Sequence, residues 1–303
     1  MSLMYLAKIN LTSAIYDLYQ NKINIDDVTK SIYNQLNDQI KYSVVSNKKY
    51  KDSLGNTRKY HQNSIYTLTE LNKMDDLIIT GKMVRTFRRP TERINDKGKV
   101  ISSFNTDNVS IYFYFDVKNE LVAFSERQSF GYNQFIIAFN YMINQNKEKY
   151  KFEIFLQKDN MVLQEKINRL KSVYSVKATL IPPNSNEVDL KEFRETLQYI
   201  KDCESMNANK MRIEVSADNE LNSLRTESKY MQDIFKAVSR GYGDVTTYGI
   251  NENGKKQIVS SNLDAALTRI VDENLVEPEY NDEAHNFILS FLGKKARGIL
   301  YGK

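Results

Sequence analysis

The 303-residue sequence contains one cysteine, two histidines, four prolines and no tryptophan. The single cysteine, Cys203, excludes an internal disulfide and any zinc site built from several cysteines. The two histidines, His61 and His285, are too few for a histidine-rich metal centre but still permit one catalytic base. The low proline and glycine contents exclude a collagen-like or linker-dominated chain. We expect neither a bound metal nor another cofactor.

Long hydrophobic runs are also missing. No stretch approaches the roughly 18 to 20 apolar residues that span a membrane. The segment from Met1 to Asn10 carries Lys8 inside its apolar stretch and has no small-residue cleavage site, so we do not expect a secretory signal. These features predict a cytoplasmic protein that makes no contact with a membrane.

What the chain does contain is typical of a folded protein. Hydrophobic residues make up 41% of the sequence, and it contains 20 tyrosines and 14 phenylalanines. The apolar periodicity predicts an α+β fold. An antiparallel meander is expected in residues 1–146, and alternating strands and helices in mixed sheets in residues 147–303. These two parts are either separate domains or halves of one compact fold.

Alternating or continuous apolar runs predict strands in both halves of the chain. The expected strands are Met4–Ile9, Ile65–Leu71, Leu77–Arg88, Val109–Val117, Leu121–Glu126, Phe152–Leu156, Tyr174–Ile181, Met211–Val215, Val245–Ile250, Gln257–Ser260 and Ala265–Val271. The residues between Val117 and Leu121 are expected to close a tight hairpin.

Apolar residues at helical spacing predict the helices. The expected helices are Asn24–Ile40, Asn133–Asn144, Met161–Leu170, Val188–Ile200, Thr226–Ser239 and Asp282–Leu300. Residues 46–63 are polar and basic and contain Leu54-Gly55-Asn56, which predicts a loop. Gly241 and Gly243 are expected to end a helix and permit a turn, because they follow a helix and not the strand that a dinucleotide-binding loop requires.

The positive charge is concentrated in two segments. Residues 41–99 contain fourteen Lys or Arg against six Asp or Glu, an excess of +8, and residues 288–303 contain four basic residues and no acidic one. Because the whole chain carries +5, the remainder carries −7. Such asymmetry indicates an anionic partner better than the net charge does, since clustered cations neutralise phosphates and release counterions.

The densest basic part is the strand that ends near Arg88. On an extended strand, Lys82 and Arg88 share one face, while Arg85 shares the other with Phe87. Basic and aromatic residues arranged in this way suit a surface that follows phosphates, although the same charges also protect a solvated strand edge from aggregation. The residues expected to bind nucleic acid are Lys48, Lys49, Lys51, Arg58, Lys59, Lys82, Arg85, Arg88, Arg89, Arg93, Lys294, Lys295 and Arg297.

Catalytic motifs are scarce. Asp116 and Lys118 form an Asp-x-Lys pair that could hold a metal and activate water, but polar residues that flank a hairpin turn explain the same pattern. His61, within the basic segment, is a candidate general base for RNA cleavage, or simply an exposed histidine. We therefore assign no catalytic residue and keep these three as candidates for an alternative function.

One resemblance rests on the order of the elements. The hairpin Tyr112–Phe124, the apolar helix that follows it, and the stretch from Met211–Val215 through Gly243-Asp244-Val245 to Gly254-Lys255-Lys256 carry it. Across about residues 60–275, the chain resembles an uncharacterised prokaryotic family linked to phage resistance, and also the Rex-like phage exclusion proteins, whose RexA member is a dimeric DNA-binding protein. The resemblance implies a non-enzymatic DNA-binding or DNA-sensing role in abortive infection.

Together, these observations lead us to expect a homodimeric DNA-binding protein of bacterial antiphage defence. Its expected partner is nucleic acid, preferentially duplex DNA. Two alternatives remain open: a nuclease-type toxin that uses Asp116 or His61 on DNA or RNA, and a protein-interaction subunit that senses or inhibits a phage protein, with a partner from the host or the phage.

Overall fold

The computed structural model describes residues 1–52, 55–94, 96, 98, 100–145, 150–184, 197–217 and 223–296. The first part of the chain contains the elements β1 (Ser2–Leu11), α1 (Ile15–Tyr19), α2 (Ile25–Gln35), β2 (Lys41–Lys51), β3 (Thr57–Met74), β4 (Ile78–Ile94), β5 (Val100–Asp116), β6 (Leu121–Ser125) and α3 (Tyr132–Ile143). The second part contains β7 (Phe152–Leu156), α4 (Asn160–Asn168), β8 (Leu170–Leu180), α6 (Gln198–Ser205), β9 (Met211–Ser216), α7 (Lys229–Ser239), β10 (Gly243–Asn251), β11 (Lys256–Ser260), α8 (Ser261–Asp264), β12 (Thr268–Val271) and α9 (Glu277–Ala296). The predicted α+β class is confirmed.

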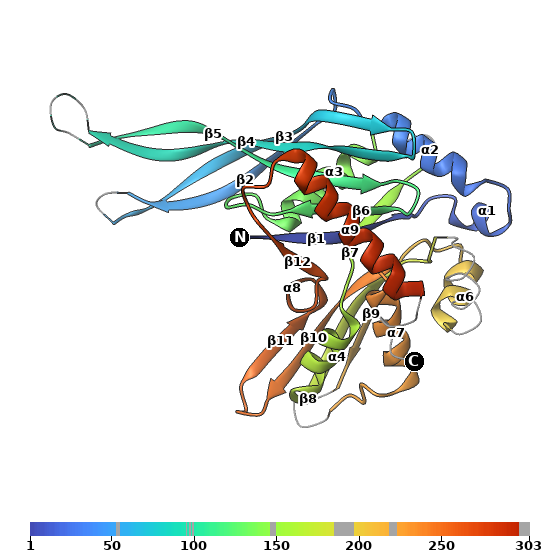
Figure 1. Ribbon diagram of the computed structural model, residues 1–303. Helices are drawn as coiled ribbons and strands as arrows, with labels where there is room; N and C mark the ends of the chain where they lie inside the picture. Colours follow the sequence, from blue (N-terminus) through green and yellow to red (C-terminus); the bar gives the residue numbers. More distant parts are fainter. Residues whose placement is uncertain are drawn as a thin grey trace.

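The larger sheet is arranged around β1. Its strand order is β12-β1-β6-β5-β4-β3-β2, and β7 also pairs with β1. One edge of β1 pairs with β6, and the other is shared by β12 near its start and β7 near its end. Because β7 and β12 come from beyond residue 147, the predicted division at residue 146 does not separate the two sheets (Figure 1).

The smaller sheet has the order β11-β10-β8-β9. All described strand pairs, in both sheets, are antiparallel, so the mixed sheets expected from the alternating pattern are not found. An alternating strand–helix pattern is typical of parallel strands joined by crossover helices. Here α6 lies between β8 and β9, which pair antiparallel, and α4 leads from β7 in the larger sheet to β8 in the smaller one, which is why the pattern was misleading.

Helices cover both faces of the larger sheet. On one face, α3 stacks Phe135 on Phe124 with a centroid separation of 3.9 Å. On the other, α9 packs Tyr280 and Phe287 into a cluster that includes Met4. The predicted apolar helix Asn133–Asn144 is therefore the helix α3 at the centre of the molecule, and the final helix begins at Glu277, five residues before the expected start. Within the described residues, no helix has the length and apolar content needed to cross a membrane.

Residues 46–51 and 57–63 are not the predicted loop, because they are paired in the long antiparallel hairpin of β2 and β3. The next two strands are also longer than expected, since β4 continues to Ile94 and β5 begins at Val100. Both hairpins project well beyond the helices (Figure 1). Solvent reaches both faces there, so apolar alternation, the usual signature of a strand, is missing from the sequence.

Two local predictions agree with the structure. The hairpin between β5 and β6 closes with Asp116 paired to Leu121. Helix α7 ends at Ser239, and Gly241 follows with a φ of +80°, the left-handed conformation that glycine adopts without strain. The expected helix Asn24–Ile40 ends earlier, at Gln35. Most of the expected helix Val188–Ile200 lies outside the described residues, and its last residues begin α6.

Candidate nucleic-acid interface

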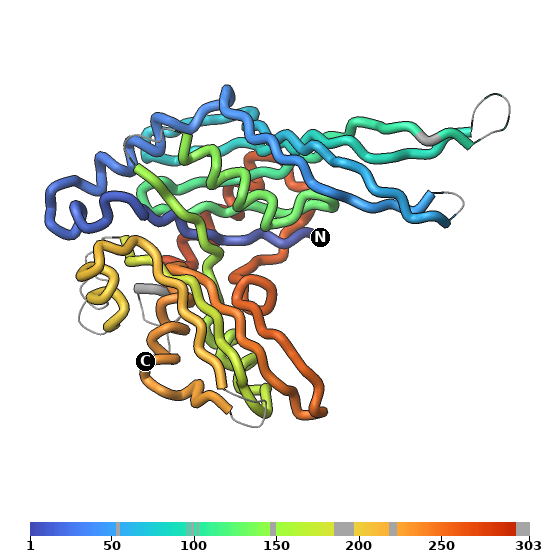
Figure 2. The backbone as a smooth tube through the Cα atoms, turned by 180° about the vertical axis from the view of Figure 1, so that it is seen from behind, coloured from blue at the N-terminus to red at the C-terminus, as the bar shows by residue number. Residues whose placement is uncertain are grey.

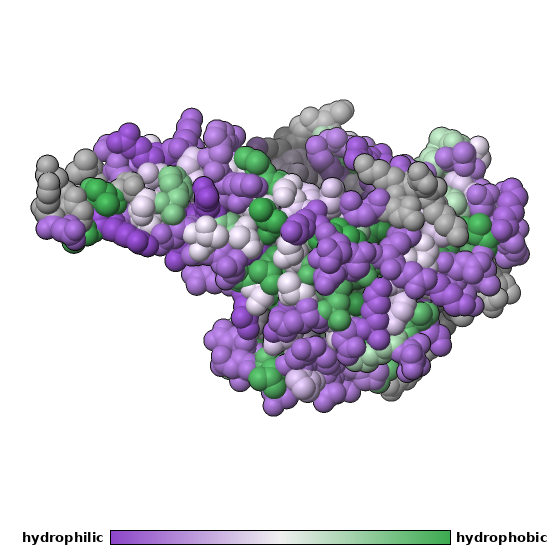
Figure 3. Space-filling model, turned by 90° about the horizontal axis from the view of Figure 1, so that it is seen from above, coloured by the Kyte–Doolittle hydropathy of each residue, from purple (hydrophilic) through white to green (hydrophobic). Residues whose placement is uncertain are grey.

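Two hairpins form an arm that extends from the larger sheet. β3 and β4 are paired from Met74–Ile78 as far as Ser64–Phe87, and beyond that point the described ladder between them ends. Each hairpin then continues as its own two-stranded ribbon. We call residues 44–64 and 87–107 the basic arm. Figures 1 and 2 show both ribbons on the same side of the molecule, and Figure 3 shows a largely hydrophilic surface there.

Cations occupy both faces of the β2–β3 ribbon. Lys49 lies directly opposite Lys59, and Lys51 lies two residues further along the same face. Lys48 lies opposite Tyr60 on the other face, where Arg58 lies opposite Tyr50. All five basic side chains belong to exposed residues. Directly opposed like charges destabilise an antiparallel pair, so this arrangement costs the free protein stability.

Acidic side chains do little to neutralise this ribbon. Asp52 is the only acidic residue between positions 41 and 63. Its carboxylate lies 3.0 Å from the Arg58 guanidinium and accepts a 2.8 Å hydrogen bond from the Asn56 amide in the turn. Within the described residues, Lys48, Lys49, Lys51 and Lys59 make no ion pair.

The β4–β5 ribbon adds three arginines. Arg89 is paired with Asp107 at 2.6 Å, and Arg93 donates a 3.0 Å hydrogen bond to Asn105. Arg88 is exposed and has no ion pair within the described part of the chain. Gln62 links the two ribbons near their base, because its amide donates to the backbone carbonyl of Arg88 at 3.0 Å.

Arg85 does not belong to this surface, which corrects its assignment as a phosphate contact. Its side chain lies on the buried face of β4, and the residue is only 5% exposed. The guanidinium donates to the Ser64 hydroxyl, the Gln62 side-chain oxygen and the carbonyl of Ser129. The sequence placed Arg85 and Phe87 on the same face, but it did not show that α3 and its neighbours cover that face.

Lys82 is also engaged within the protein. Its ammonium group lies 2.6 Å from the Glu70 carboxylate and 5.0 Å from the centre of the Tyr112 ring. The hydrogen bond to Glu70 raises the pKa of Lys82. A lysine held in this way contributes little to a surface that binds phosphate, so Lys82 is not part of the candidate interface, contrary to the prediction.

The basic end of the last helix does not join the arm. Helix α9 crosses the larger sheet and ends on the side opposite to the ribbon tips (Figures 1 and 2). Lys294 is exposed near that end. The side chain of Lys295 and all of Arg297 lie outside the described residues. Lys294 therefore does not share a surface with the basic arm. This is contrary to the expectation that the basic end of the last helix helps the arm to bind nucleic acid.

The three candidate catalytic residues lie in different surroundings. The Asp116 carboxylate accepts hydrogen bonds from the backbone amide and side chain of Asn119, at 3.0 and 2.7 Å, as a hairpin turn requires. Lys118 lines a cavity of about 150 Å³ together with Lys8 and Gln157. His61 is exposed on β3, opposite Asn47. Within the described residues, no group of three or more His, Cys, Asp or Glu side chains is arranged to hold a metal ion.

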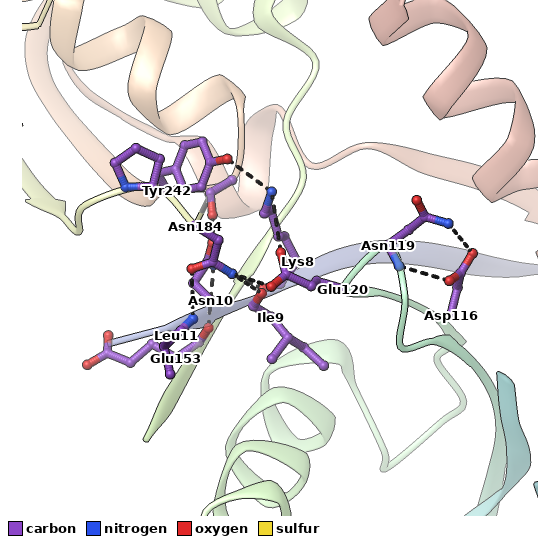
Figure 4. A network of polar contacts seen from close by, with 12 residues as sticks. Lys8, Ile9, Asn10, Leu11, Asp116, Asn119, Glu120, Glu153, Asn184 and Tyr242 are labelled. Carbon is purple, nitrogen blue, oxygen red and sulfur yellow. Dashed lines mark hydrogen bonds and ion pairs between the residues drawn. The ribbon is translucent and has the colours of Figure 1, made fainter. Parts of the chain in front are cut away.

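A buried polar network, which the sequence analysis did not identify, joins the two sheets (Figure 4). The Lys8 ammonium donates to the Tyr242 hydroxyl at 3.0 Å and lies 3.9 Å from the Glu120 carboxylate. Glu120 also accepts a 2.8 Å hydrogen bond from Asn184, which in turn accepts one from the backbone amide of Leu11. These residues are far apart in the sequence, so local patterns carried no signal for the network. Its contacts fix β1 against the segments that follow β8 and α7.

The fold and its basic arm define the class: an α+β protein with two antiparallel sheets and a projecting pair of cationic β-ribbons. Residues 18–277 match the family described as Domain of unknown function (DUF4747), so the chain belongs to that family. The match includes the whole basic arm. A comparison with curated proteins finds no match.

Proposed function

We propose that this protein binds DNA through the basic arm, without cleaving it, as part of bacterial antiphage defence. The observation that carries the proposal is the set of exposed lysines on the β2–β3 ribbon that have no ion pair among the described residues: Lys48, Lys49, Lys51 and Lys59. Arg58, Arg88, Arg89 and Arg93 extend the cationic surface along the two ribbons.

Electrostatics favours a polyanion as the partner. The opposed Lys49 and Lys59 repel each other in the free protein, and phosphates beside them would remove that repulsion. Binding would also release counterions from the nucleic acid, which makes the affinity fall steeply with salt. The proposal therefore predicts strongly salt-dependent binding with weak sequence selectivity.

The proposal also includes a biological setting. A role in phage exclusion and a homodimeric state are supported by the resemblance, and a cytoplasmic location by the composition. Light scattering after gel filtration tests the homodimer, and plaque counts on cells with and without the intact protein test the defence role.

Binding is tested by changing Lys48, Lys49, Lys51 and Lys59 to alanine and measuring fluorescence anisotropy with a labelled DNA duplex over a salt series. We expect at least about a tenfold loss of affinity at moderate salt, and a salt slope smaller by about three to four, because each lysine faces one phosphate. The control variant removes the same charge elsewhere, by changing four exposed lysines of the second half of the chain to alanine: Lys171, Lys201, Lys229 and Lys255. Equal losses in the two variants, or none in the first, would contradict the proposal.

Protein interaction is a second candidate, favoured by the tip of the β4–β5 ribbon. Ile94 and Val100 are cross-strand partners, 76% and 50% exposed, and Phe104 on the same face is 53% exposed. Exposed apolar side chains in a group are typical of contact surfaces. Changing Ile94 and Phe104 to serine distinguishes the candidates: loss of a co-purifying protein, with DNA affinity unchanged, favours protein interaction.

A further inference from the structure

The outer part of the β2–β3 hairpin is a ribbon with two open edges. β2 is the last strand of the larger sheet, and residues 57–63 of β3 pair with β2 but have no described ladder with β4. Seven cross-strand pairs, from Val45–Asn63 to Lys51–Thr57, make up this two-stranded ribbon. At about 3.3 Å per residue it extends for about 20 Å.

The distribution of charge on this ribbon restricts the shape of its partner. Lys49, Lys51 and Lys59 extend from one face. Lys48 and Arg58 extend from the other face, on which the Tyr60 ring lies 5.8 Å from the Phe104 ring of the β4–β5 ribbon, and both basic residues remain exposed there. A flat polyanionic surface could contact only one of these faces. A groove with a phosphate backbone on each side contacts both at once.

We infer that the β2–β3 ribbon stands in the major groove of B-form duplex DNA, with one cationic face toward each phosphate backbone. This inference rests on the proposed DNA binding and specifies its substrate. The major groove is about 12 Å wide and admits a two-stranded ribbon, whereas the minor groove is only about 6 Å wide. A sheet with its side chains is about 10 Å thick, which matches the wider groove. The major groove of A-form RNA is too narrow for side chains to enter, so duplex RNA is excluded as an equal substrate.

The second ribbon fits the same arrangement. Arg88 lies beside the base of the first ribbon, where Gln62 bonds to its carbonyl. Arg88 is exposed there, so the proposal places it beside a phosphate backbone outside the groove.

The first test compares four probes by anisotropy: a 20-base-pair DNA duplex, the same duplex with a glucosyl group on C5 of each cytosine, the single strand, and the duplex RNA of equal sequence. Cytosine C5 faces the major groove, so the glucosylated duplex blocks that groove without changing the phosphates. We expect tight binding to the plain duplex and at least about a tenfold loss with each other probe. Equal binding to the plain and glucosylated duplexes overturns the groove assignment but leaves DNA binding intact, whereas no salt-dependent binding to any probe overturns both.

The second test separates the two faces of the ribbon. One variant changes Lys49 and Lys59 to alanine, and its partner changes Lys48 and Arg58, so each removes two charges from one face. A ribbon inside a groove loses affinity in both variants. The salt slope falls by about two in the first and by about one to two in the second, because Arg58 is paired with Asp52 in the free protein. If only one variant binds more weakly, the ribbon lies flat on the DNA and the inference is wrong. Far-ultraviolet circular dichroism confirms that both variants keep their strands.

Discussion

Lys49 and Lys59 lie directly opposite each other across the β2–β3 hairpin, with Lys51 next to them on the same face. Such a pair lowers the stability of the free ribbon, which means that the sequence keeps an unfavourable local arrangement where a neutral pair would be more stable. Natural proteins break such local rules mainly at functional sites, which agrees with the proposed role of the ribbon. This relationship leads to the first prediction.

Changing Lys49 to glutamate gives opposite effects on stability and on binding. An attraction between the new carboxylate and the Lys59 ammonium replaces the repulsion, so the ribbon gains about 0.2–1 kcal/mol. Hydrogen exchange of the β2 and β3 amides becomes slower, while DNA affinity falls because a negative charge faces the phosphates. Lys49→Ala serves as the intermediate control for both measurements. Faster exchange in the glutamate variant would show that the two lysines do not repel each other.

Arg85 and Arg88 are expected to behave in opposite ways, although only three positions separate them. Arg85→Ala leaves the Ser129 carbonyl and the Gln62 oxygen without their donor in a buried site, so the free energy of unfolding falls by about 2–4 kcal/mol. Arg88→Ala changes stability by less than about 0.5 kcal/mol, because its side chain is exposed. Urea denaturation gives the first quantity.

DNA binding by the same two variants provides the comparison. The folded fraction of Arg85→Ala binds with unchanged affinity, whereas Arg88→Ala binds more weakly and its salt slope is smaller by about one. An Arg85 variant that folds normally but fails to bind DNA would return Arg85 to the interface.

Substitutions in the Lys8–Glu120 pair test how much the junction between the two sheets contributes to stability. Glu120→Gln leaves the Lys8 charge buried without its carboxylate, which lowers the free energy of unfolding by about 3–5 kcal/mol. Lys8→Met combined with Glu120→Gln recovers part of this loss, because no buried charge remains. Chemical denaturation of the wild type, both single variants and the double variant measures the coupling. Additive losses in the double variant would show that the two groups do not interact.

Lys158 gives the protein a defined dependence of stability on pH. Complete burial lowers the pKa of this lysine to about 7, and the nearby Asp244 carboxylate opposes the shift only in part. Below pH 7 the ammonium is charged in both the folded and unfolded states, and the folded state bears the cost of burying it. Between pH 7 and 10 the folded state releases the proton while the unfolded chain keeps it, so the contribution of Lys158 to stability rises with pH, by roughly 4 kcal/mol.

Lys158→Met removes this titration. Its free energy of unfolding relative to the wild type is greatest at pH 6–7 and falls by a few kcal/mol toward pH 10. The lost hydrogen bond to the Leu156 carbonyl adds an offset that does not depend on pH, so the slope is the measured quantity. A difference that stays constant from pH 6 to pH 10 would show that Lys158 is not desolvated.

The sequence by itself determined the position and type of those elements that have at least one buried face. Apolar periodicity located α3 and the part of β5 from Val109 onward, and the glycine after α7 marked the end of that helix. The basic segment was also visible as a concentration of Lys and Arg. Its conformation was not, because a ribbon with two solvated faces has no apolar alternation, so residues 46–63 were predicted to be a loop. The turn signal at Gly55-Asn56, with polar residues on both sides, was the only clue to the hairpin.

Only the tertiary structure decided which cations share a surface. Arg85 and Arg88 differ in burial because they lie on opposite faces of the strand. The Arg85 face is covered by residues that include Ser129, far along the chain, whereas solvent reaches Arg88. The Lys49–Lys59 pairing depends on the hairpin register, and the separation of Lys294 from the arm depends on the direction of α9. Composition fixed how much positive charge the protein carries, whereas long-range packing fixed where that charge is free to meet a partner.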